Sequence, residues 1–367
     1  MLTITMSRRD FLKYVGLASG WTMTPAATAW NCWGSDLPCQ VMRNQKLRWI
    51  VPYSPGGGFD VYSRLIAPQL ATKIGAAISV ENFPGAGGSL GSRRIQRAQP
   101  DGRTLGLINA PGLLTAALTG ATQAPNPLED FSILGRVVRS RTVWVAKTGS
   151  NLKHMDDVFR VAAQRPLLCA ISEVGSTNFV GAAVTSSILK LPVDYLAGFP
   201  GTRQSTLALI RNEVDFVALT FESALDRIEN GDLKVILQIS DKPISNHPSL
   251  HGVPFLGGPA GLAARQAQRK GQPPENVINQ ARALESLIGA GRLVVAPPRL
   301  PEDTFKCLEE GLHATLTDAR FQRQAAKVQR TLDVARAYEA RTVLAEAASS
   351  ANAFTAIVRQ TIARMRE

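Results

Sequence analysis

A glycine-rich stretch between an apolar run and a helix-like segment constrains this chain more than any other feature. Residues Ser54–Asp60 read Ser-Pro-Gly-Gly-Gly-Phe-Asp and follow the apolar run Leu47–Val51. Apolar residues then recur at helical spacing over 61–70. This order predicts a strand, a tight turn and a helix. Because glycine has no Cβ, a ligand can approach the backbone there, and the unpaired N–H groups of the helix start favour an anion.

A second stretch repeats this arrangement. Ile78–Glu81 is typical of a strand, Asn82–Ser89 is a loop with three glycines, and a helical pattern follows over 90–95. Either loop alone is equally consistent with a plain turn between a strand and a helix. Two such loops, roughly 30 residues apart, favour a ligand cleft.

A third strand, turn and helix follows later in the chain. Leu167–Ile171 is an apolar run, Ser172–Asn178 is a small polar turn, and apolar residues at helical spacing continue over 179–188. The same order of strand, polar turn and helix therefore recurs in what we predict to be a second unit of the chain.

These motifs carry a resemblance to a known family. Val51–Asp60 resembles the opening signature of the Bug-type solute receptors, which are the periplasmic binding proteins of the tripartite tricarboxylate transporter family. Glu81–Gly91 is similar to their second signature, and Ala98–Leu105 resembles the turn and strand that follow. Where those receptors commonly carry an aromatic residue, a lysine and a glycine, this chain has Phe-Pro-Gly at 199–201. If that lysine holds a ligand charge in relatives, this chain must hold the charge otherwise.

The resemblance implies an α/β fold of two lobes, the periplasmic-binding-protein or Venus-flytrap fold, with the ligand cleft between them. The alternation of strand-like and helix-like segments independently favours α/β architecture with largely parallel sheets. We expect 46–143 to begin lobe 1, 144–240 to form lobe 2, and 241–367 to return to lobe 1. The resemblance is weakest near 257–290, which we predict to be a variable surface insertion or mobile loop whose role the sequence does not define.

The first 29 residues are typical of a leader. Ser7–Lys13 contains paired arginines, an apolar stretch follows, and Ala27–Ala29 is a small-x-small cleavage site. We predict a twin-arginine signal peptide over 1–29 and a periplasmic location. Its removal lowers the formal charge from +12 to about +10. The remaining basic residues are dispersed and no nucleic-acid motif accompanies them, so an anionic small ligand or simple solubility accounts for the charge.

Four cysteines bear on the redox compartment. In an oxidising periplasm Cys32 and Cys39 could form a disulfide, although the sequence alone does not decide this. Cys169 lies in an apolar run and is predicted to be a core residue, and Cys307 is isolated.

Signals of catalysis are absent from the sequence. The histidines His154, His247, His251 and His313 lack metal-ligand spacing, and there is no nucleophile elbow or Walker motif. We therefore predict no catalytic residues, no metal, no cofactor and no enzymatic activity. A dinucleotide-binding domain is a weaker alternative, because 56–58 does not read G-x-G-x-x-G.

The resemblance implies that a monomeric receptor captures a small carboxylate for the membrane subunits of a tripartite carrier. The sequence does not say whether this is a di- or tricarboxylate, an acidic amino acid or an aromatic carboxylate. Two alternatives stay open: a periplasmic sensor that feeds a signalling partner, and a periplasmic enzyme acting on an anionic substrate. The predicted ligand-binding residues are Ser54, Gly57, Gly58, Phe59, Asp60, Gly87, Asn109, Ser172, Gly175, Ser176, Thr177, Phe199 and Thr220.

Charged residues near the predicted cleft leave the sign of the ligand open. Asp60, Glu173 and Glu222 would favour a cationic ligand if they faced it. The arginines that could instead meet an anion are Arg64, Arg103 and Arg203.

Overall fold

The computed structural model describes residues 39–120, 124–174, 176–199 and 201–365. Residues 38–367 form one unit. The predicted signal peptide and Cys32 lie outside the described residues. Among the described residues, no helix is both long and apolar enough to cross a membrane.

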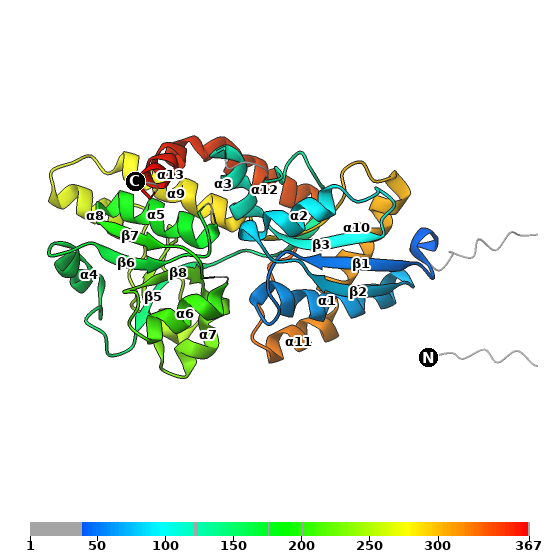
Figure 1. The fold of residues 1–367 in the computed structure, drawn as a ribbon, viewed down its shortest axis with the longest axis horizontal. Helices are drawn as coiled ribbons and strands as arrows, with labels where there is room; N and C mark the ends of the chain where they lie inside the picture. Colours follow the sequence, from blue (N-terminus) through cyan, green and yellow to red (C-terminus); the bar gives the residue numbers. More distant parts are fainter. Residues whose placement is uncertain (1–38, 121–123, 175, 200, 366–367) are drawn as a thin grey trace, which may run out of the picture. The chain divides into compact units, whose positions relative to one another are not determined.

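A six-stranded sheet forms the centre of the first lobe (Figure 1). Its strands are β1 (Lys46–Val51), β2 (Ala77–Asn82), β3 (Thr104–Asn109), β4 (Ser132–Val138), β10 (Arg292–Ala296) and β11 (Ala335–Arg336). They lie in the order β11-β4-β10-β3-β1-β2. The first three strands run parallel, because each is followed by a helix that returns the chain. Strand β10 runs antiparallel between β3 and β4, so a segment far along the chain completes the middle of this sheet.

Two further small sheets form the centre of the second lobe. Their strands are β5 (Thr142–Lys147), β6 (Leu167–Ala170), β7 (Val193–Leu196), β8 (Val217–Thr220) and β9 (Leu233–Gln238). Strands β6 and β7 are parallel, but β5 is antiparallel to both β8 and β9. The prediction of largely parallel sheets is therefore wrong for this lobe. The reason is that β5 carries the chain into the lobe and β9 carries it out, so the two strands must run in opposite directions.

Helices cover both faces of the first sheet. The helices of the described residues are α1 (Gly58–Ile74), α2 (Ser89–Gln96), α3 (Ala110–Leu118), α4 (Met155–Ala162), α5 (Thr177–Leu189), α6 (Thr202–Ile210), α7 (Phe221–Glu229), α8 (Leu262–Arg269), α9 (Glu275–Gly289), α10 (Glu302–Thr317), α11 (Ala319–Lys327), α12 (Ala337–Ser350) and α13 (Asn352–Arg364). Leu70 of α1 and Leu308 of α10 belong to one buried cluster, and Ile95 of α2 belongs to another, because α2 covers the opposite face (Figure 1). The β1–α1 unit is thereby held from both sides.

A disulfide joins Cys39, ahead of β1, to Cys307 of α10. The sequence left open whether Cys39 pairs with Cys32, and the structure pairs it with Cys307 instead, so Cys307 is not an isolated thiol. The two bonded cysteines are 268 residues apart in the sequence, and only the folded chain brings their Cα atoms within 4.9 Å. Cys169 is buried as a free thiol, as the sequence predicts.

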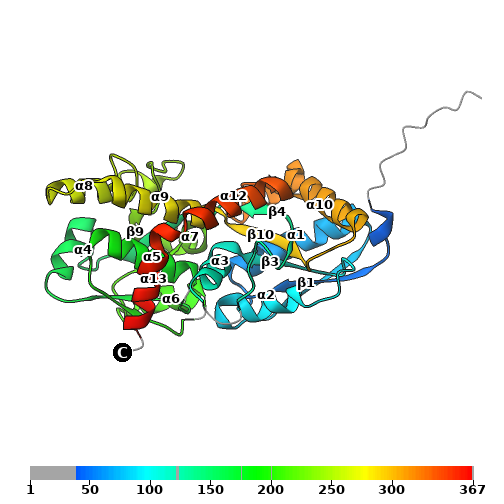
Figure 2. The ribbon, with the colours of Figure 1, turned by 90° about the horizontal axis from the view of Figure 1, so that it is seen from above.

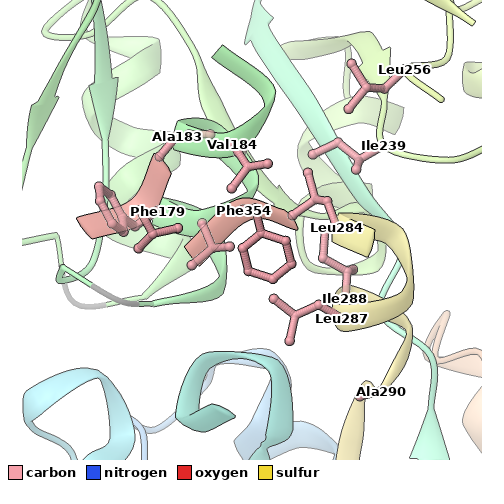
Figure 3. Close-up of a cluster of buried hydrophobic side chains, with 14 of the residues drawn as sticks. Phe179, Ala183, Val184, Ile239, Leu256, Leu284, Leu287, Ile288, Ala290 and Phe354 are labelled. Carbon is pink, nitrogen blue, oxygen red and sulfur yellow. The ribbon is translucent and has the colours of Figure 1, made fainter. Parts of the chain in front are cut away.

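The segment 257–290 is not a surface loop. It forms α8 and α9, and the side chains of Leu284, Leu287 and Ile288 are almost completely buried. They pack with Phe179 of α5 and Phe354 of α13 in the largest core cluster (Figure 3). The interpretation as an exposed insertion is wrong because the polar residues of 265–274 lie only on the outer face of α8 and in the short connection to α9, while the other faces of both helices are buried.

The C-terminal helices contribute to both lobes. Helix α12 packs on β4 of the first sheet, and α13 continues to α5 and α9 (Figure 2). After residue 241 the chain thus returns to the first sheet through β10 while also completing the core around α5. The lobe boundaries at 143 and 240 remain a prediction.

Candidate functional site

A cavity lies between the loops of the two lobes. It is lined from the first lobe by the β1–α1 loop and the loop before α2, and from the second lobe by the starts of α5, α6 and α7. Ten of the predicted ligand-binding residues lie in this lining: Ser54, Gly57, Gly58, Phe59, Gly87, Asn109, Ser172, Ser176, Thr177 and Thr220. The structure therefore brings the three loops together, as the repeated strand–turn–helix pattern predicts.

Two predicted residues are elsewhere. Asp60 is absent from the lining, and its side chain is directed to the backbone and to neighbouring side chains. Phe199 is also absent, because it packs against the apolar cluster around α6 and α7. Gly175 lies outside the described residues, as does Pro200, which stands in place of the family's lysine.

Asp60 shapes the glycine loop from behind. Its carboxylate accepts hydrogen bonds from the Gly56 N–H at 2.9 Å, from Arg64 Nε at 3.0 Å and from Asn82 Nδ2 at 2.9 Å. Gly56 has a φ of 77°, a conformation that favours glycine. Burial alone would raise the pKa of Asp60, but the hydrogen bonds from Arg64, Gly56 and Asn82 outweigh it and hold the pKa below its ordinary 3.8. Asp60 therefore fixes the loop as an anion.

Tyr53 links the two glycine loops. Its hydroxyl donates to the Gly87 carbonyl at 3.1 Å, and its ring stacks on Phe59 with centroids 4.3 Å apart. A Cβ at Gly88 would lie 2.6 Å from the Tyr53 oxygen, so glycine is required there. Burial raises the pKa of this phenol, with a smaller opposing effect of a hydrogen bond to Asn109, and Tyr53 stays neutral at any physiological pH.

Six helices of the described residues have their N-cap residue in the cavity lining. These N-caps are Gly57 (α1), Gly88 (α2), Asn109 (α3), Ser176 (α5), Gly201 (α6) and Thr220 (α7). Each helix start presents N–H groups and the positive end of a helix dipole. The caps of α1, α6 and α7 make no side-chain hydrogen bond to their helix. Helix starts from both lobes therefore make the cavity attractive to an anion.

Thr177 connects the lobes through the cavity wall. Its hydroxyl donates to Asn109 Oδ1 at 2.9 Å. Asn109 Oδ1 also accepts from the Gly112 N–H, which caps α3. The two predicted residues thus contact each other across the cleft.

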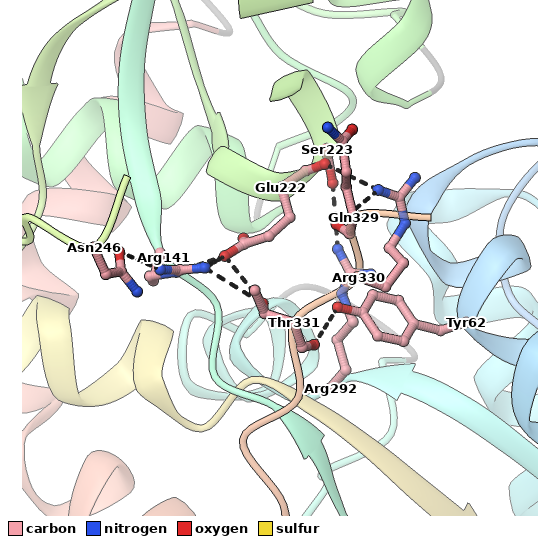
Figure 4. Close-up of polar contacts among 9 residues, drawn as sticks. All are labelled: Tyr62, Arg141, Glu222, Ser223, Asn246, Arg292, Gln329, Arg330 and Thr331. Carbon is pink, nitrogen blue, oxygen red and sulfur yellow. Dashed lines mark hydrogen bonds and ion pairs between the residues drawn. The ribbon is translucent and has the colours of Figure 1, made fainter. Parts of the chain in front are cut away.

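Arg292 is a functional candidate that sequence reasoning missed. It is the first residue of β10, it lines the cavity, and only 3% of its surface is exposed. Its Nη2 donates to Ser223 Oγ at 3.3 Å (Figure 4), whereas Nε and Nη1 have no hydrogen-bond partner among the described residues. The guanidinium lies 4.4 Å from the ring centre of Phe59 and 4.9 Å from that of Tyr62. Burial lowers the pKa of Arg292, and the nearby Tyr62 and Glu222 partly offset this decrease.

The missed residues had weak sequence signals. Arg292 directly precedes the apolar run Leu293–Ala296, and a charge at the start of a fully buried strand is the signal that could have found it. Gly201 and the start of α6, residues 202–205, line the cavity where only Phe199 was predicted. Tyr53 and Ser223 lie beside predicted residues and carried no separate signal.

The charges around the cavity favour an anion. Asp60 is bound by Arg64, and Glu222 is buried and paired with Arg141, so neither acid is available to a cation (Figure 4). Glu173 is the one acidic residue in the lining, against Arg203 and Arg292. Arg103 is not in the lining. Among the described residues no group of His, Cys, Asp and Glu could hold a metal ion.

The fold and the cavity define a two-lobed α/β binding protein. Residues 62–264 match the tripartite tricarboxylate transporter family receptor, and the chain belongs to this family. It is of the Bug type, as the motifs at 51–60 and 81–91 indicate.

Relatives and solved structures agree with this assignment. The chain is 24% identical over 220 residues to a UPF0065 protein from the tcbD-tcbE intergenic region of Pseudomonas sp. strain P51, covering 60% of this chain and 64% of that protein. It thus spans less than two thirds of that relative. The fold is similar to MatC of Rhodopseudomonas palustris with bound malate (TM-score 0.66, 20% identity, 86% of this chain and 99% of MatC). It is also similar to the periplasmic binding protein BugD (TM-score 0.68, 19% identity, 85% of this chain and 97% of BugD).

Proposed function

We propose that the chain is a periplasmic receptor that captures a small carboxylate in this cleft and delivers it to the membrane subunits of a tripartite carrier. The observation that carries the proposal is the convergence of six helix starts of the described residues, from both lobes, on one cavity. Backbone N–H groups at a helix start bind carboxylates without a side-chain charge. The ligand would bridge the lobes and stabilise their closed arrangement.

The class of ligand follows from size and charge. The lining combines backbone N–H donors on opposite walls, at the first residues Gly58 of α1 and Thr177 of α5, which suits a molecule with acceptors at both ends. MatC is a neighbour solved with malate, a dicarboxylate, which supports the same class here. Within the carboxylates we propose a di- or tricarboxylate, because helix starts on both walls can each meet one carboxylate.

The observations disfavour an enzyme. Among the described residues that line the cavity there is no His or Cys, and Glu173 is the one carboxylate. A solute-binding role without catalysis is therefore part of the proposal. We further propose that the receptor acts as a monomer. A sensor that reports to a signalling partner would use the same cleft, and only growth on the ligand separates the two roles.

Ligand binding is tested with the purified mature protein. We expect at least one of malate, citrate, adipate, glutamate and benzoate to raise the melting temperature, since a ligand specific for the folded state stabilises it by mass action. Calorimetry then gives the affinity, and the corresponding neutral amides are the control. The proposal fails if no carboxylate binds or if the amides bind equally well. Loss of uptake on deletion of the gene separates transport from sensing.

Export through the twin-arginine pathway is part of the proposal. The paired Arg8 and Arg9 support this route. The Cys39–Cys307 disulfide supports the periplasmic location alone, since such bonds persist mainly in oxidising compartments. We expect the double change of Arg8 and Arg9 to Lys to abolish export, because the pathway reads the arginine pair as an address. Unchanged periplasmic yield would contradict this route.

A further inference from the structure

The most unusual group in the cleft is the buried guanidinium of Arg292. Transfer of a charged group from water into a protein costs several kcal/mol unless partners compensate for it. Arg292 has one hydrogen bond, to Ser223, at a long 3.3 Å. Its Nε and Nη1 atoms have no hydrogen-bond acceptor among the described residues. The fold thus keeps a cation at the cavity whose donors it satisfies only in part.

The surroundings hold this guanidinium in place. Phe59 and Tyr62 offer their ring faces at 4.4 and 4.9 Å, which favours a flat, oriented cation. Glu222 contributes its charge at longer range, but its carboxylate is bound by Arg141 and Thr331 (Figure 4). No carboxylate of the described residues forms an ion pair with Arg292 within 4.0 Å.

The glycine loop lies directly against the guanidinium. A Cβ built on Gly58 would be 3.0 Å from both Nη1 and Nη2 of Arg292 and 3.0 Å from Ser223 Oγ. Gly58 is also the first residue of α1. The start of the longest helix and the guanidinium therefore face the same point, so two independent sources of positive potential coincide there.

We infer that Arg292 is the residue that recognises ligand charge: one carboxylate of the ligand binds in the cavity beside the point where its guanidinium adjoins the start of α1. This inference rests on the proposed function and deepens it. The inference places a carboxylate at the first-lobe end of the cleft. The corresponding amide or alcohol should bind poorly there, because a neutral group accepts the paired N–H donors of a charged guanidinium less well than a carboxylate does. Arg292 would also supply the positive charge that the family's lysine carries and that Pro200, at that position here, cannot supply.

The central experiment compares two buried arginines on adjacent strands. Arg292→Met removes the guanidinium that is proposed to bind the ligand carboxylate. Arg136→Met is the matched control, because Arg136 of β4 is 5% exposed, is paired with Asp333 and is not in the lining. Affinities for the tightest-binding carboxylate of the panel and for its monoamide are measured by calorimetry, with a melting curve for each variant.

We expect Arg292→Met to weaken carboxylate binding about ten- to a hundredfold, as for a charge-assisted hydrogen bond. The preference for the carboxylate over its monoamide should shrink by a similar factor. The melting temperature of the ligand-free variant should not fall, because replacing a poorly paired buried charge by an apolar side chain is often neutral or stabilising. Arg136→Met should lower the melting temperature and leave the affinity within about twofold.

The outcomes separate the two ideas. If the parent protein binds none of the carboxylates, the proposed function fails and this inference with it. If the parent binds and Arg292→Met binds equally well with the same preference, the inference is overturned and the proposed function stands. If Arg292→Met does not fold, the same measurements are made on Arg292→Lys, because lysine keeps the positive charge but lacks the planar pair of N–H donors. A several-fold loss then supports the inference, and unchanged affinity overturns it.

Discussion

The two walls of the cleft are built from different chemistry. The first-lobe wall is backbone and fixed geometry: two glycine loops, held by Asp60 and Tyr53, beside one buried cation. The second-lobe wall is mostly short polar side chains at helix starts, among them Ser176, Thr177 and Thr220. A backbone wall offers the same groups to any ligand, whereas hydroxyl and amide side chains can be exchanged without disturbing the fold.

This difference predicts a division of labour. The first lobe should hold the common feature of the ligands, a carboxylate, and changes there that enter the cavity should weaken binding most. The second lobe should determine which carboxylate binds, and single changes there should cost less. The following changes test that division, from the largest expected effect to the smallest.

Replacing 262–282 by a short Gly/Ser linker should abolish cooperative unfolding. The change removes α8 and half of α9, with the buried side chains of Leu262, Ala263 and Ala281, and so removes the support of α5 behind the second-lobe wall. The loss, on the order of 5 kcal/mol, is comparable to the whole stability of a domain. Denaturant melts followed by circular dichroism measure it.

The matched control for this replacement is the exposed connection between the two helices. Exchanging 270–273 for Gly and Ser should leave the melt nearly unchanged, because these residues are exposed. If the variant with 262–282 replaced still unfolded cooperatively, this segment would be a dispensable insertion after all.

Gly58→Val should weaken carboxylate binding by about a hundredfold or more while the protein still folds. The new Cβ would lie 3.0 Å from the Arg292 guanidinium and from Ser223, so the effect is steric. The loss combines a blocked backbone approach with a displaced charge, each equivalent to about tenfold. Gly57→Ala is the comparison, because its Cβ meets only Ser54 O at 3.5 Å and should cost much less. If Gly58→Val and the parent protein bound the carboxylate with equal affinity, this loop would not be part of the ligand-binding site.

Thr177→Val should weaken the same ligand by roughly two- to tenfold, since it removes one neutral hydrogen-bonding hydroxyl. The hydroxyl donates to Asn109 across the cleft, so its loss also weakens the contact between the walls. Thr185→Val on the same helix is the control, because Thr185 is buried, outside the lining, and its hydroxyl has no described partner. Calorimetry on both variants should show a loss only for Thr177→Val. If Thr177→Val lost more affinity than Gly58→Val, the second lobe rather than the first would make the larger contribution to binding.

Asp60→Asn should have the smallest effect on affinity, about threefold or less, because it loosens the glycine loop without entering the cavity. The effect on stability should depend on pH. The pKa of Asp60 is below 3.8 in the folded protein, so its carboxylate stabilises the fold above that pH and the contribution is lost as the pH falls through the folded pKa. The variant should be less stable by about 1 kcal/mol at pH 7. The difference between the two proteins should shrink as the pH falls below 3.8, and a difference that stayed constant over that range would assign the effect to something other than the charge.

Local pattern determined the parts of the site that are contiguous in sequence. The stretch 54–60 predicted a strand, a glycine turn and a helix start, and the structure has β1, the loop and α1 there. The same holds for 172–178 ahead of α5. Glycine and small polar residues act within a few positions of themselves, through backbone freedom and capping, so the sequence displays them directly.

Only the tertiary structure decided the features that join distant segments. Arg292 enters the cleft because β10 inserts between β3 and β4, and no residue near it in sequence indicates its neighbours Gly58 and Ser223. The Cys39–Cys307 bond and the burial of α9 against α5 have the same origin. A side chain's charge is visible in the sequence, but its exposure and its partners depend on packing between elements far apart in the chain, which residue periodicity does not encode.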